Sequence, residues 1–350
     1  MSIFKGERLT IDIFGESHSE EIGAKVQGMP TTKLDEKSLE EFLNRRKAKN
    51  AVFSTPRKEA DEPIFSGITD GIISDKYSFV IKNGNVKKSD YDDLYAKPRP
   101  SHADYARYLK EGTLDFSGGG RFSGRMTAPL CVAGGICKQY LADNGVEVVA
   151  YVSSIGNALG RSYKNGDIPC EEAKTLSMQG FPSLDGKKEM LDEIERAASE
   201  GDSIGGTVEC IVYGLKGGLG DNLFGGLEGK IASLVYAIPG VKGVEFGAGF
   251  DLSKMRGSEA NDPIVIENGK IKVCNNFSGG INGGISNGEN LTLRVAFRPT
   301  PSISKPQRTV DLVKAENTTI TVKGRHDSCI VPRAVPCVES MVCIALTDIL

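Results

Sequence analysis

Three histidines are the only ones in this 350-residue chain, and each lies in a short polar motif. The motifs are GESHS at residues 15–19, RPSHAD at residues 99–104 and GRHD at residues 324–327. Because imidazole changes charge near neutral pH, all three are candidates for proton transfer. A single histidine is more often a packed or surface residue than a catalyst, whereas three in such settings favour one shared site.

Acid–base catalysis explains these motifs more simply than nucleophilic catalysis. Ser17 adjoins His18, but neighbouring side chains of an extended strand point in opposite directions, so adjacency does not predict a Ser–His dyad. In an extended run through residues 325–327, the histidine would oppose the arginine and aspartate beside it. We therefore predict proton-transfer roles for His18, His102 and Asp327 ahead of His326.

Arginines surround the same motifs. Guanidinium groups bind phosphate and carboxylate through paired, planar hydrogen bonds. If several of them converge with the histidines, they form a site for a ligand that carries more than one negative group. Seven arginines lie within or beside loops marked by glycine or proline: Arg46, Arg57, Arg99, Arg121, Arg125, Arg325 and Arg333.

The chain contains 42 glycines, many in pairs or triplets, yet none of these runs matches a known nucleotide cradle. There is no G-x-x-x-x-G-K-[ST] motif, and the triplet at residues 118–120 lacks the spacing and downstream acid of a dinucleotide fingerprint. The histidines are single, without the paired spacing that metal ligation uses. We therefore predict no metal site.

Composition restricts the partners and the compartment. The 43 basic and 46 acidic residues leave a formal charge of −3, which argues against a chain-wide surface for nucleic acid. Eight dispersed cysteines without a Cys-x-x-Cys pair predict free thiols. No apolar run reaches the roughly 18 residues that span a bilayer, and the N-terminus lacks a signal-peptide pattern. We expect a cytoplasmic protein that binds neither nucleic acid nor membrane.

Hydrophobic periodicity predicts strands and helices in mixed order. The expected strands lie near residues 9–14, 24–28, 77–82, 146–152, 207–213, 291–297 and 319–323. Shorter helices are expected after Asp35, after Asp185 and from Leu227 to the residues before Pro239. Without strict βαβ alternation, and without a linker-like segment, these elements predict one α+β domain over residues 1–350.

Two further helices, at residues 123–142 and 336–350, are apolar all round, which predicts burial at the centre of the molecule. Each is associated with a basic motif, with Arg121 and Arg125 at the start of the first and Arg325 and Arg333 before the second. This parallel suggests an internal pseudo-symmetry between two halves of the chain.

Taken together, the motifs resemble those of chorismate synthase, and seven blocks occur in the order of that family. They are FGESH at 14–18, TPRKEADE at 55–62, RPSHADY at 99–105, GGGRFSGR at 118–125, GDSIGG at 201–206, GGINGGIS at 279–286, and GRHDSC at 324–329 with RAVP at 333–336. Seven ordered blocks are highly specific, although any one alone would not be.

The resemblance implies a lyase that converts 5-enolpyruvylshikimate 3-phosphate to chorismate and phosphate by 1,4-elimination, the last common step toward the aromatic amino acids. It implies reduced FMN as cofactor without net redox change, with NADPH needed only if the enzyme reduces its own flavin. A separate flavin reductase is the other source of reduced cofactor. The family fold is an α+β sandwich of central helices between antiparallel β-sheets, assembled as a homotetramer.

Site residues carry over by motif. His18 would donate a proton toward the departing phosphate, His102 would keep the reduced flavin correctly protonated, and Asp327 would accept the proton relayed through flavin N5. The phosphate and two carboxylates of the substrate would bind Arg46, Arg57, Arg99, Arg125 and Arg333. The flavin would bind Arg121, Ser123, Gly240, Gly283, Arg298, Pro299, Thr300, Pro301, Ser302 and Arg325.

Three positions depart from the usual family pattern, namely Ser19, Val52 and Met126. They bear on ligand affinity rather than on reaction type, because none of them is a proton-transfer residue. Two other functions stay open at this point: an FMN-dependent NAD(P)H oxidoreductase, for which the chain has no Rossmann fingerprint, and a non-catalytic binder of phosphorylated small molecules.

Overall fold

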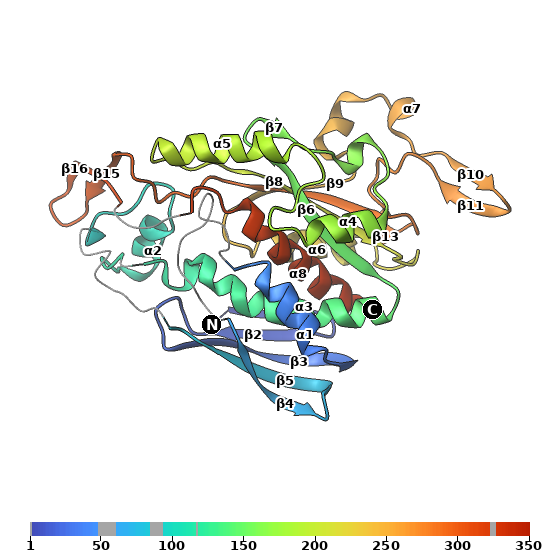
Figure 1. Cartoon of the computed structure of the whole chain (residues 1–350), viewed down its shortest axis with the longest axis horizontal. Coiled ribbons are helices and arrows are strands. Elements are labelled where there is room, and N and C mark those ends of the chain that lie inside the picture. The colour runs from blue at the N-terminus through green and yellow to red at the C-terminus, as the bar shows by residue number, and fades with distance from the viewer. Residues whose placement is uncertain (1, 48–60, 85–93, 117, 323–326) are drawn as a thin grey trace.

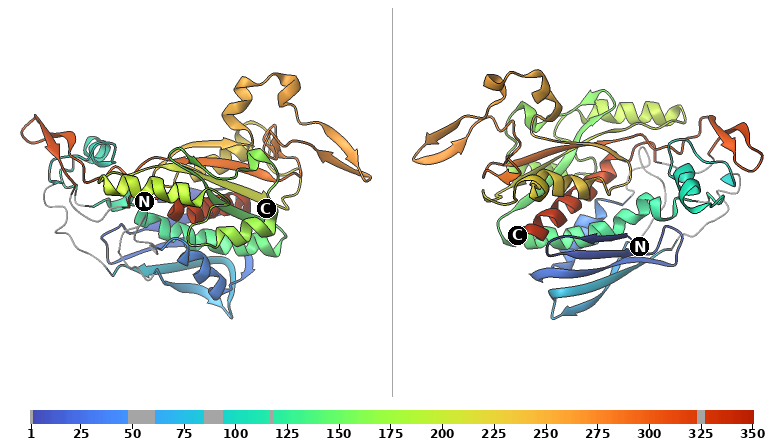
Figure 2. Two further views of the ribbon diagram at one scale, coloured as in Figure 1. Left: turned by 45° about the horizontal axis from the view of Figure 1, so that its top comes forward. Right: turned by 180° about the vertical axis from the view of Figure 1, so that it is seen from behind.

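Two antiparallel sheets enclose a layer of helices in the computed structural model, which describes residues 2–47, 61–84, 94–116, 118–322 and 327–350 (Figure 1). The long helices α3 (Thr127–Asp143) and α8 (Val331–Ile349) run between the sheets, and further helices cover the outer face of the second sheet (Figures 1 and 2). The expected layered α+β sandwich with two central helices is therefore confirmed.

The first sheet has the strand order β1-β2-β3-β5-β4. Its strands are β1 (Ser2–Lys5), β2 (Thr10–Phe14), β3 (Glu21–Lys33), β4 (Pro63–Thr69) and β5 (Ile72–Lys82). Along β3, Ile22, Ala24 and Val26 are buried while Lys25 is exposed. This alternation turns one face of the sheet toward the helices and leaves the other toward solvent.

The second sheet has the order β7-β6-β8-β14-β9 and is covered on both faces. Its strands are β6 (Glu147–Ile155), β7 (Ala158–Leu159), β8 (Gly206–Tyr213), β9 (Val241–Phe246) and β14 (Leu291–Phe297). The central helices cover its inner face, and α4 (Cys170–Ser177) and α5 (Lys187–Ser199) lie over the outer face. Because both faces are covered, β6 is buried along nearly its whole length.

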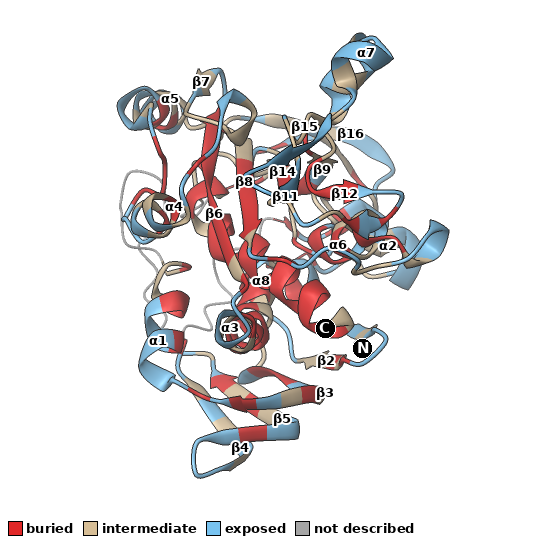
Figure 3. Ribbon diagram, turned by 90° about the vertical axis from the view of Figure 1, so that its right-hand side faces the viewer, coloured by how far each residue is buried: buried red, intermediate tan, exposed pale blue. Residues whose placement is uncertain are grey.

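The central layer also contains α1 (Glu36–Asn44) and α6 (Leu227–Val235). Helices α3 and α8 touch closely, since a Cβ added at Gly134 would lie 2.3 Å from the Cβ of Ser340. Glycine at this crossing lets the two backbones approach. Figure 3 shows α8 buried along its length, as its apolar sequence predicted.

The two halves of the chain repeat one topology. In the first half, β3 leads to α1, then to β4, β5 and α3, and the three strands pair in the order β3-β5-β4. In the second half, β8 leads to α6, then to β9, β14 and α8, and the strands pair in the order β8-β14-β9. The suggested internal pseudo-symmetry is therefore present in the strand order, and the two central helices are equivalent elements of it.

Shorter elements make up the rest of the regular structure in the described residues. The helices are α2 (Asp104–Glu111) and α7 (Gly257–Ala260), with 3₁₀ turns η2 (Gly120–Phe122), η3 (Gly124–Met126), η4 (Tyr163–Asn165), η5 (Leu223–Gly225) and η6 (Gly249–Lys254). Three two-stranded hairpins are β10 (Ile264–Glu267) with β11 (Lys270–Val273), β12 (Ile281–Asn282) with β13 (Ile285–Ser286), and β15 (Gln307–Asp311) with β16 (Glu316–Ile320). No helix of the described ranges is long and apolar enough to cross a bilayer.

Several boundaries differ from the sequence prediction. The helix expected at residue 336 begins at Val331, because Pro332 is tolerated in a first turn and Pro336 lies inside a helix that burial holds in place. The segment expected to be helical from residue 123 is 3₁₀ until Thr127. The helix after Asp185 starts at Lys187 with Gly186 as its N-cap, so Asp185 is not the cap. The strand expected at 319–323 runs over Glu316–Ile320.

Candidate active site

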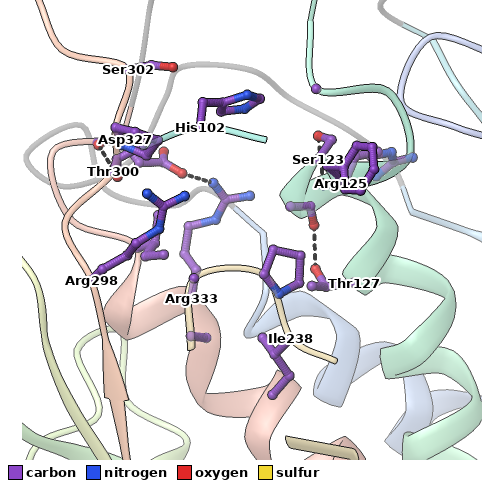
Figure 4. Close-up of a pocket in the computed structure, with 18 of the residues that line it drawn as sticks. His102, Ser123, Arg125, Thr127, Ile238, Arg298, Thr300, Ser302, Asp327 and Arg333 are labelled. Carbon is purple, nitrogen blue, oxygen red and sulfur yellow. Dashed lines mark hydrogen bonds and ion pairs between the residues drawn. The ribbon is translucent and has the colours of Figure 1, made fainter. Parts of the chain in front are cut away.

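A cavity of about 310 Å³ lies where the ends of the central helices meet (Figure 4). Its walls come from the end of α1, the start of α3, residues 238–240 after α6, residues 298–302 after β14 and the start of α8. The RPSHAD loop supplies a further wall through Arg99 and His102. Because α3 and α8 both begin at the cavity, the positive ends of their dipoles favour an anionic ligand there.

The lining is strongly cationic. Among the described lining residues, Asp327 is the one carboxylate, against five arginines: Arg46, Arg99, Arg125, Arg298 and Arg333. Burial lowers the pKa of Arg298, which donates to the carbonyl of Ser101. The balance of charge suits a ligand that carries several negative groups.

Asp61 joins two of these arginines. Its two carboxylate oxygens accept from Arg46 and Arg125, and all three side chains are buried. Burial raises the pKa of Asp61, but the charges of Arg46 and Arg125 outweigh it and the pKa is lowered overall. Arg125 also donates from Nε to Asn83 Oδ1 at 3.0 Å. Asp61 therefore holds two guanidinium groups at one wall of the cavity.

Asp327 and Arg333 form the opposite wall. Arg333 Nη1 lies 2.7 Å from Asp327 Oδ2, and Arg333 Nε donates to the carbonyl of Arg46 at 3.0 Å. The Asp327 carbonyl accepts from Thr300 Oγ1 at 3.1 Å. These contacts connect the start of α8 to the end of α1 and to the loop after β14, so Asp327 has a defined position (Figure 4).

His102 is partly buried and belongs to a polar group with the buried Arg99 and Asp104. His102 Nδ1 lies 2.6 Å from Asp104 Oδ1, and Arg99 Nε donates to Asp104 Oδ2 at 2.7 Å. Burial would raise the pKa of Asp104, but hydrogen bonds from His102 and Arg99 lower it to about 2. The carboxylate is therefore ionised, and it can only accept hydrogen bonds.

His18 lies close to the cavity without lining it. A Cβ added at Gly118 would lie 2.1 Å from His18 Cε1, so the imidazole packs directly on that glycine. The Gly118 carbonyl accepts from Arg99 Nη2 at 2.9 Å. The two histidines are thus linked through one glycine and one arginine, although 84 positions separate them in sequence (102 − 18).

Ser17 behaves differently from the strand-based expectation. Ser17 Oγ and His18 Nδ1 lie within hydrogen-bond distance at 2.9 Å. Their side chains do not point apart as predicted, because residues 17 and 18 lie in a turn after β2 rather than in an extended strand. The hydrogen bond orients the His18 ring without establishing a nucleophile.

The remaining predicted residues fall into three groups. Ser123, Gly240 and residues 298–302 line the cavity. Arg121 is half-exposed and pairs with Glu111 at 2.7 Å, and Gly283 lies at the β12–β13 turn; neither is among the lining residues. Arg57, Arg325, His326 and the departure at Val52 lie outside the described residues.

Sequence reasoning missed two carboxylates that organise the site. Asp61 lies in the motif at residues 55–62, and Asp104 lies in the motif at residues 99–105. Both motifs were recognised, but neither aspartate was given a role. For Asp104 a signal existed, since it lies only two residues from His102 in the same motif. For Asp61 no local signal existed, because Arg46 and Arg125 reach it from distant parts of the chain.

Comparisons with known proteins agree with this arrangement. A family model described as chorismate synthase matches residues 9–350. A chorismate synthase of Dehalococcoides mccartyi is 44% identical over 355 residues, covering 100% of this chain and 96% of that protein. A chorismate synthase of Korarchaeum cryptofilum is 43% identical over 347 residues and one of Thermococcus kodakarensis 41% identical over 348, each covering 98% of this chain and 96% of that protein.

A solved structure is also similar. A crystal structure described as that of a chorismate synthase superposes with a TM-score of 0.75 over 99% of this chain and 92% of that one, at 24% sequence identity. At this identity the superposition shows a shared fold, in agreement with the layers and strand order described above.

Proposed function

The chain belongs to the chorismate synthase family, and we propose that its cationic cavity converts 5-enolpyruvylshikimate 3-phosphate to chorismate and phosphate. The observation that carries this proposal is the convergence of five arginines, His102 and Asp327 from distant segments on one cavity. A substrate with one phosphate and two carboxylates requires several fixed cations, and loss of phosphate with a ring hydrogen requires groups that move protons.

Arg46, Arg125 and Arg333 are the proposed substrate-binding arginines. Asp61 holds the first two on one wall and Asp327 holds the third on the other, so the three can contact negative groups at different points of one ligand. Arg57 is proposed for the same role from its motif. Arg99 donates mainly to Asp104 and to backbone carbonyls, so we propose that it shapes the site around His102 while its Nη1 faces Ser302.

The proton-transfer roles follow from position. His102 and Asp327 line the cavity and can exchange protons with a bound ligand. His18, behind Gly118, is proposed to protonate the departing phosphate, which an imidazolium favours by charge and by hydrogen bonding. Ser17 orients this ring through the 2.9 Å contact to Nδ1.

The cavity also suits a flavin phosphate and ring. Beside the arginines it offers an apolar patch from Ile238, Pro239 and Ile330. Gly240 has a φ of +95°, which favours glycine, so its backbone lines the cavity without a side chain. Its volume lies within the range of sites for small molecules and cofactors. Reduced FMN, when bound, supplies a transient electron that assists loss of phosphate and is recovered without net redox change.

The flavin contacts are proposed at Ser123, Gly240 and residues 298–302, with Arg121, Gly283 and Arg325 added from the family motifs. Reduced FMN reaches the enzyme either through its own NADPH-dependent reduction or through a separate reductase. Turnover supported by NADPH and FMN alone, in anaerobic solution with this protein as the sole enzyme, would establish the first route.

Assembly and location complete the proposal. We propose one catalytic domain over residues 1–350, which the shared core of both sheets and the central helices supports. A homotetramer is supported by the β10–β11 hairpin, which projects from the molecule (Figure 2). Its register places the exposed Ile264, Ile266 and Ile271 on one face. All eight cysteines are free thiols, which supports a reducing compartment such as the cytoplasm.

The deciding assay is anaerobic incubation of the protein with photoreduced FMN and 5-enolpyruvylshikimate 3-phosphate. We expect chorismate and phosphate in equal amounts, and we expect His102→Ala to lower turnover by roughly 10- to 1000-fold with a smaller effect on substrate affinity. Unchanged turnover in both His18→Ala and His102→Ala would contradict the mechanism. Absence of chorismate, together with NADPH oxidation in a parallel reaction that contains NADPH and FMN, would favour an oxidoreductase instead.

A further inference from the structure

The side chain of His102 has two ring nitrogens, and the neighbours of Nδ1 indicate which of the two carries hydrogen in the neutral form. Nδ1 lies 2.6 Å from Asp104 Oδ1 and 3.2 Å from Arg99 Nη2. Aspartate in its ionised form only accepts hydrogen bonds, and arginine only donates them. Asp104 therefore requires Nδ1 to donate, whereas Arg99 requires Nδ1 to accept. Nδ1 of one tautomer cannot do both.

The distances decide in favour of Asp104. Arg99 Nη2 carries two hydrogens and has two closer acceptors, Asp104 Oδ1 and the Gly118 carbonyl, both at 2.9 Å. Both hydrogens of Arg99 Nη2 therefore have acceptors other than His102 Nδ1. The contact between Nδ1 and Asp104 is the shortest of this group, and the low pKa of Asp104, about 2, keeps the carboxylate ionised at neutral pH. Nδ1 must be the donor.

From this geometry we propose that Asp104 is a positioning residue, which holds neutral His102 in the Nδ1–H tautomer and so leaves Nε2 as the nitrogen that acts on a bound ligand. Nε2 can then take a proton from the ligand or, in the imidazolium form, return it from the same point. This inference deepens the proposed function by stating how His102 is prepared for proton transfer, and its catalytic consequence rests on that function.

The surroundings of Asp104 keep it in place for this role. Asp104 is 4% exposed and is the first residue of α2, where the helix dipole favours a carboxylate. Its Oδ2 accepts from the backbone N–H of Arg99 at 3.0 Å and from Arg99 Nε at 2.7 Å. Its Oδ1 accepts from Arg99 Nη2 and from His102. Hydrogen bonds to both oxygens thus fix the carboxylate of Asp104, and the carboxylate in turn orients the imidazole of His102.

This arrangement predicts what Asp104→Asn does. An amide has only one oxygen, and two fixed donors from Arg99 face the Oδ2 position, whereas the Oδ1 position faces one fixed donor and the adaptable imidazole. The amide oxygen therefore takes the Oδ2 position, and the NH₂ group faces His102 Nδ1. An NH₂ group there requires Nδ1 to accept, which moves the hydrogen of neutral His102 to Nε2.

The test uses the full-length protein labelled with ¹⁵N in histidine. The chain has three histidines, so His102→Gln identifies the His102 signals by their loss. In the wild type we expect the neutral form of His102 to be protonated at Nδ1. In Asp104→Asn we expect protonation at Nε2. In Asp104→Glu, which keeps the carboxylate, we expect the Nδ1–H tautomer to return.

Turnover supplies the second readout. We expect Asp104→Asn to lower kcat by about 10- to 100-fold with KM changed by less than about threefold, and Asp104→Glu to recover most of kcat. Asp192→Asn, an exposed carboxylate on α5, is the matched control and keeps both tautomer and kcat.

Two results overturn the inference: an Nε2–H tautomer in the wild type, or an Nδ1–H tautomer with normal kcat in Asp104→Asn. If Asp104→Asn fails to fold, the wild-type and Asp104→Glu spectra still decide the tautomer. If the wild type forms no chorismate, the proposed function fails, while the tautomer of His102 is still measured independently.

Discussion

Arg45 and Glu339 form a bidentate ion pair in the interior of the protein, with Nη1 at 2.8 Å from Oε2 and Nη2 at 2.9 Å from Oε1. Glu339 is fully buried on α8, and Arg45 directly follows α1. Ala150 N donates to Oε1 at 2.8 Å, and Lys138 Nζ lies 3.2 Å from Oε2. The pair therefore joins α1 to α8 one residue before Arg46 enters the cavity.

We predict that Glu339→Gln lowers the free energy of unfolding by about 3–5 kcal/mol, because the buried charge of Arg45 loses its counter-ion. Denaturant unfolding at neutral pH measures this change. Glu316→Gln, an exposed carboxylate on β16, is the control and should change stability by less than about 0.5 kcal/mol. A loss below about 1 kcal/mol in Glu339→Gln would show that the pair contributes little.

The same carboxylate predicts a pH dependence. Burial would raise the pKa of Glu339, but the charges of Arg45 and Lys138 and the hydrogen bonds from Arg45 and Ala150 lower it to about 2, from an ordinary value of 4.5. A group with a depressed pKa stabilises the folded state above its unfolded pKa and loses that effect as pH falls. Stability should therefore decline from pH 4.5 toward pH 2, with a shallower decline in Glu339→Gln. Equal slopes for both proteins would contradict this assignment.

Gly118 and Gly112 offer a matched pair for testing His18. Both have a φ of +71°, but a Cβ at Gly118 would meet the His18 ring whereas one at Gly112 would meet nothing within 4 Å. Alanine at either position should cost about 1–2 kcal/mol in backbone strain. Only Gly118→Ala should also displace His18 and lower kcat, by about tenfold or more. Kinetics alongside thermal unfolding measure both effects, and equal kcat values in the two variants would remove His18 from the reaction.

Arg125→Lys tests the cationic wall beside Asp61. Lysine cannot reproduce the planar donors that reach both Asp61 and Asn83. We expect KM for the phosphorylated substrate to rise about tenfold, which corresponds to about 1.4 kcal/mol, while kcat stays within about threefold. Inhibition by inorganic phosphate should weaken in parallel. Arg8→Lys, on the exposed loop before β2, serves as control; equal KM values in both variants would contradict a binding role for Arg125.

Ser101 marks a strained turn beside His102. His102 N–H donates to the Arg99 carbonyl at 3.2 Å, and Ser101 has a φ of +57° after Pro100, the combination typical of a type II turn with glycine at this position. Ser101→Gly should raise the free energy of unfolding by about 1 kcal/mol. Ser233→Gly, within helix α6, should instead lower it by about 0.5–1 kcal/mol. The prediction fails if both substitutions destabilise the protein in chemical denaturation.

Local patterns in the sequence predicted many of the strands and helices that form the fold. The Leu291–Phe297 strand has the bounds that its alternation predicted, and Asp35 caps α1 by accepting from Ser38 N at 3.0 Å. The apolar sequences of α3 and α8 indicated their central position. These features depend on residues a few positions apart, where spacing alone decides which side chains share a face.

Where the observed structure differs from these local predictions, tertiary contacts are the cause. Pro336 predicted a helix start, yet α8 passes through it because contacts on every side compensate for the missing hydrogen bond. Ser17 and His18 were expected to diverge, yet a turn lets them meet. Neither outcome follows from the residues themselves, since each depends on what surrounds the segment.

The sequence by itself determined which residue types are present for chemistry and in which motifs, and through them the family. Only the tertiary structure decided which of those residues meet. Asp61 contacts Arg46 and Arg125, 15 and 64 positions away, because the fold of the first half of the chain brings the end of α1 and the start of α3 to one point. The same packing places His18 on Gly118. Contacts of this kind arise from the crossing of distant segments around a shared core, for which no short stretch of sequence carries a signal.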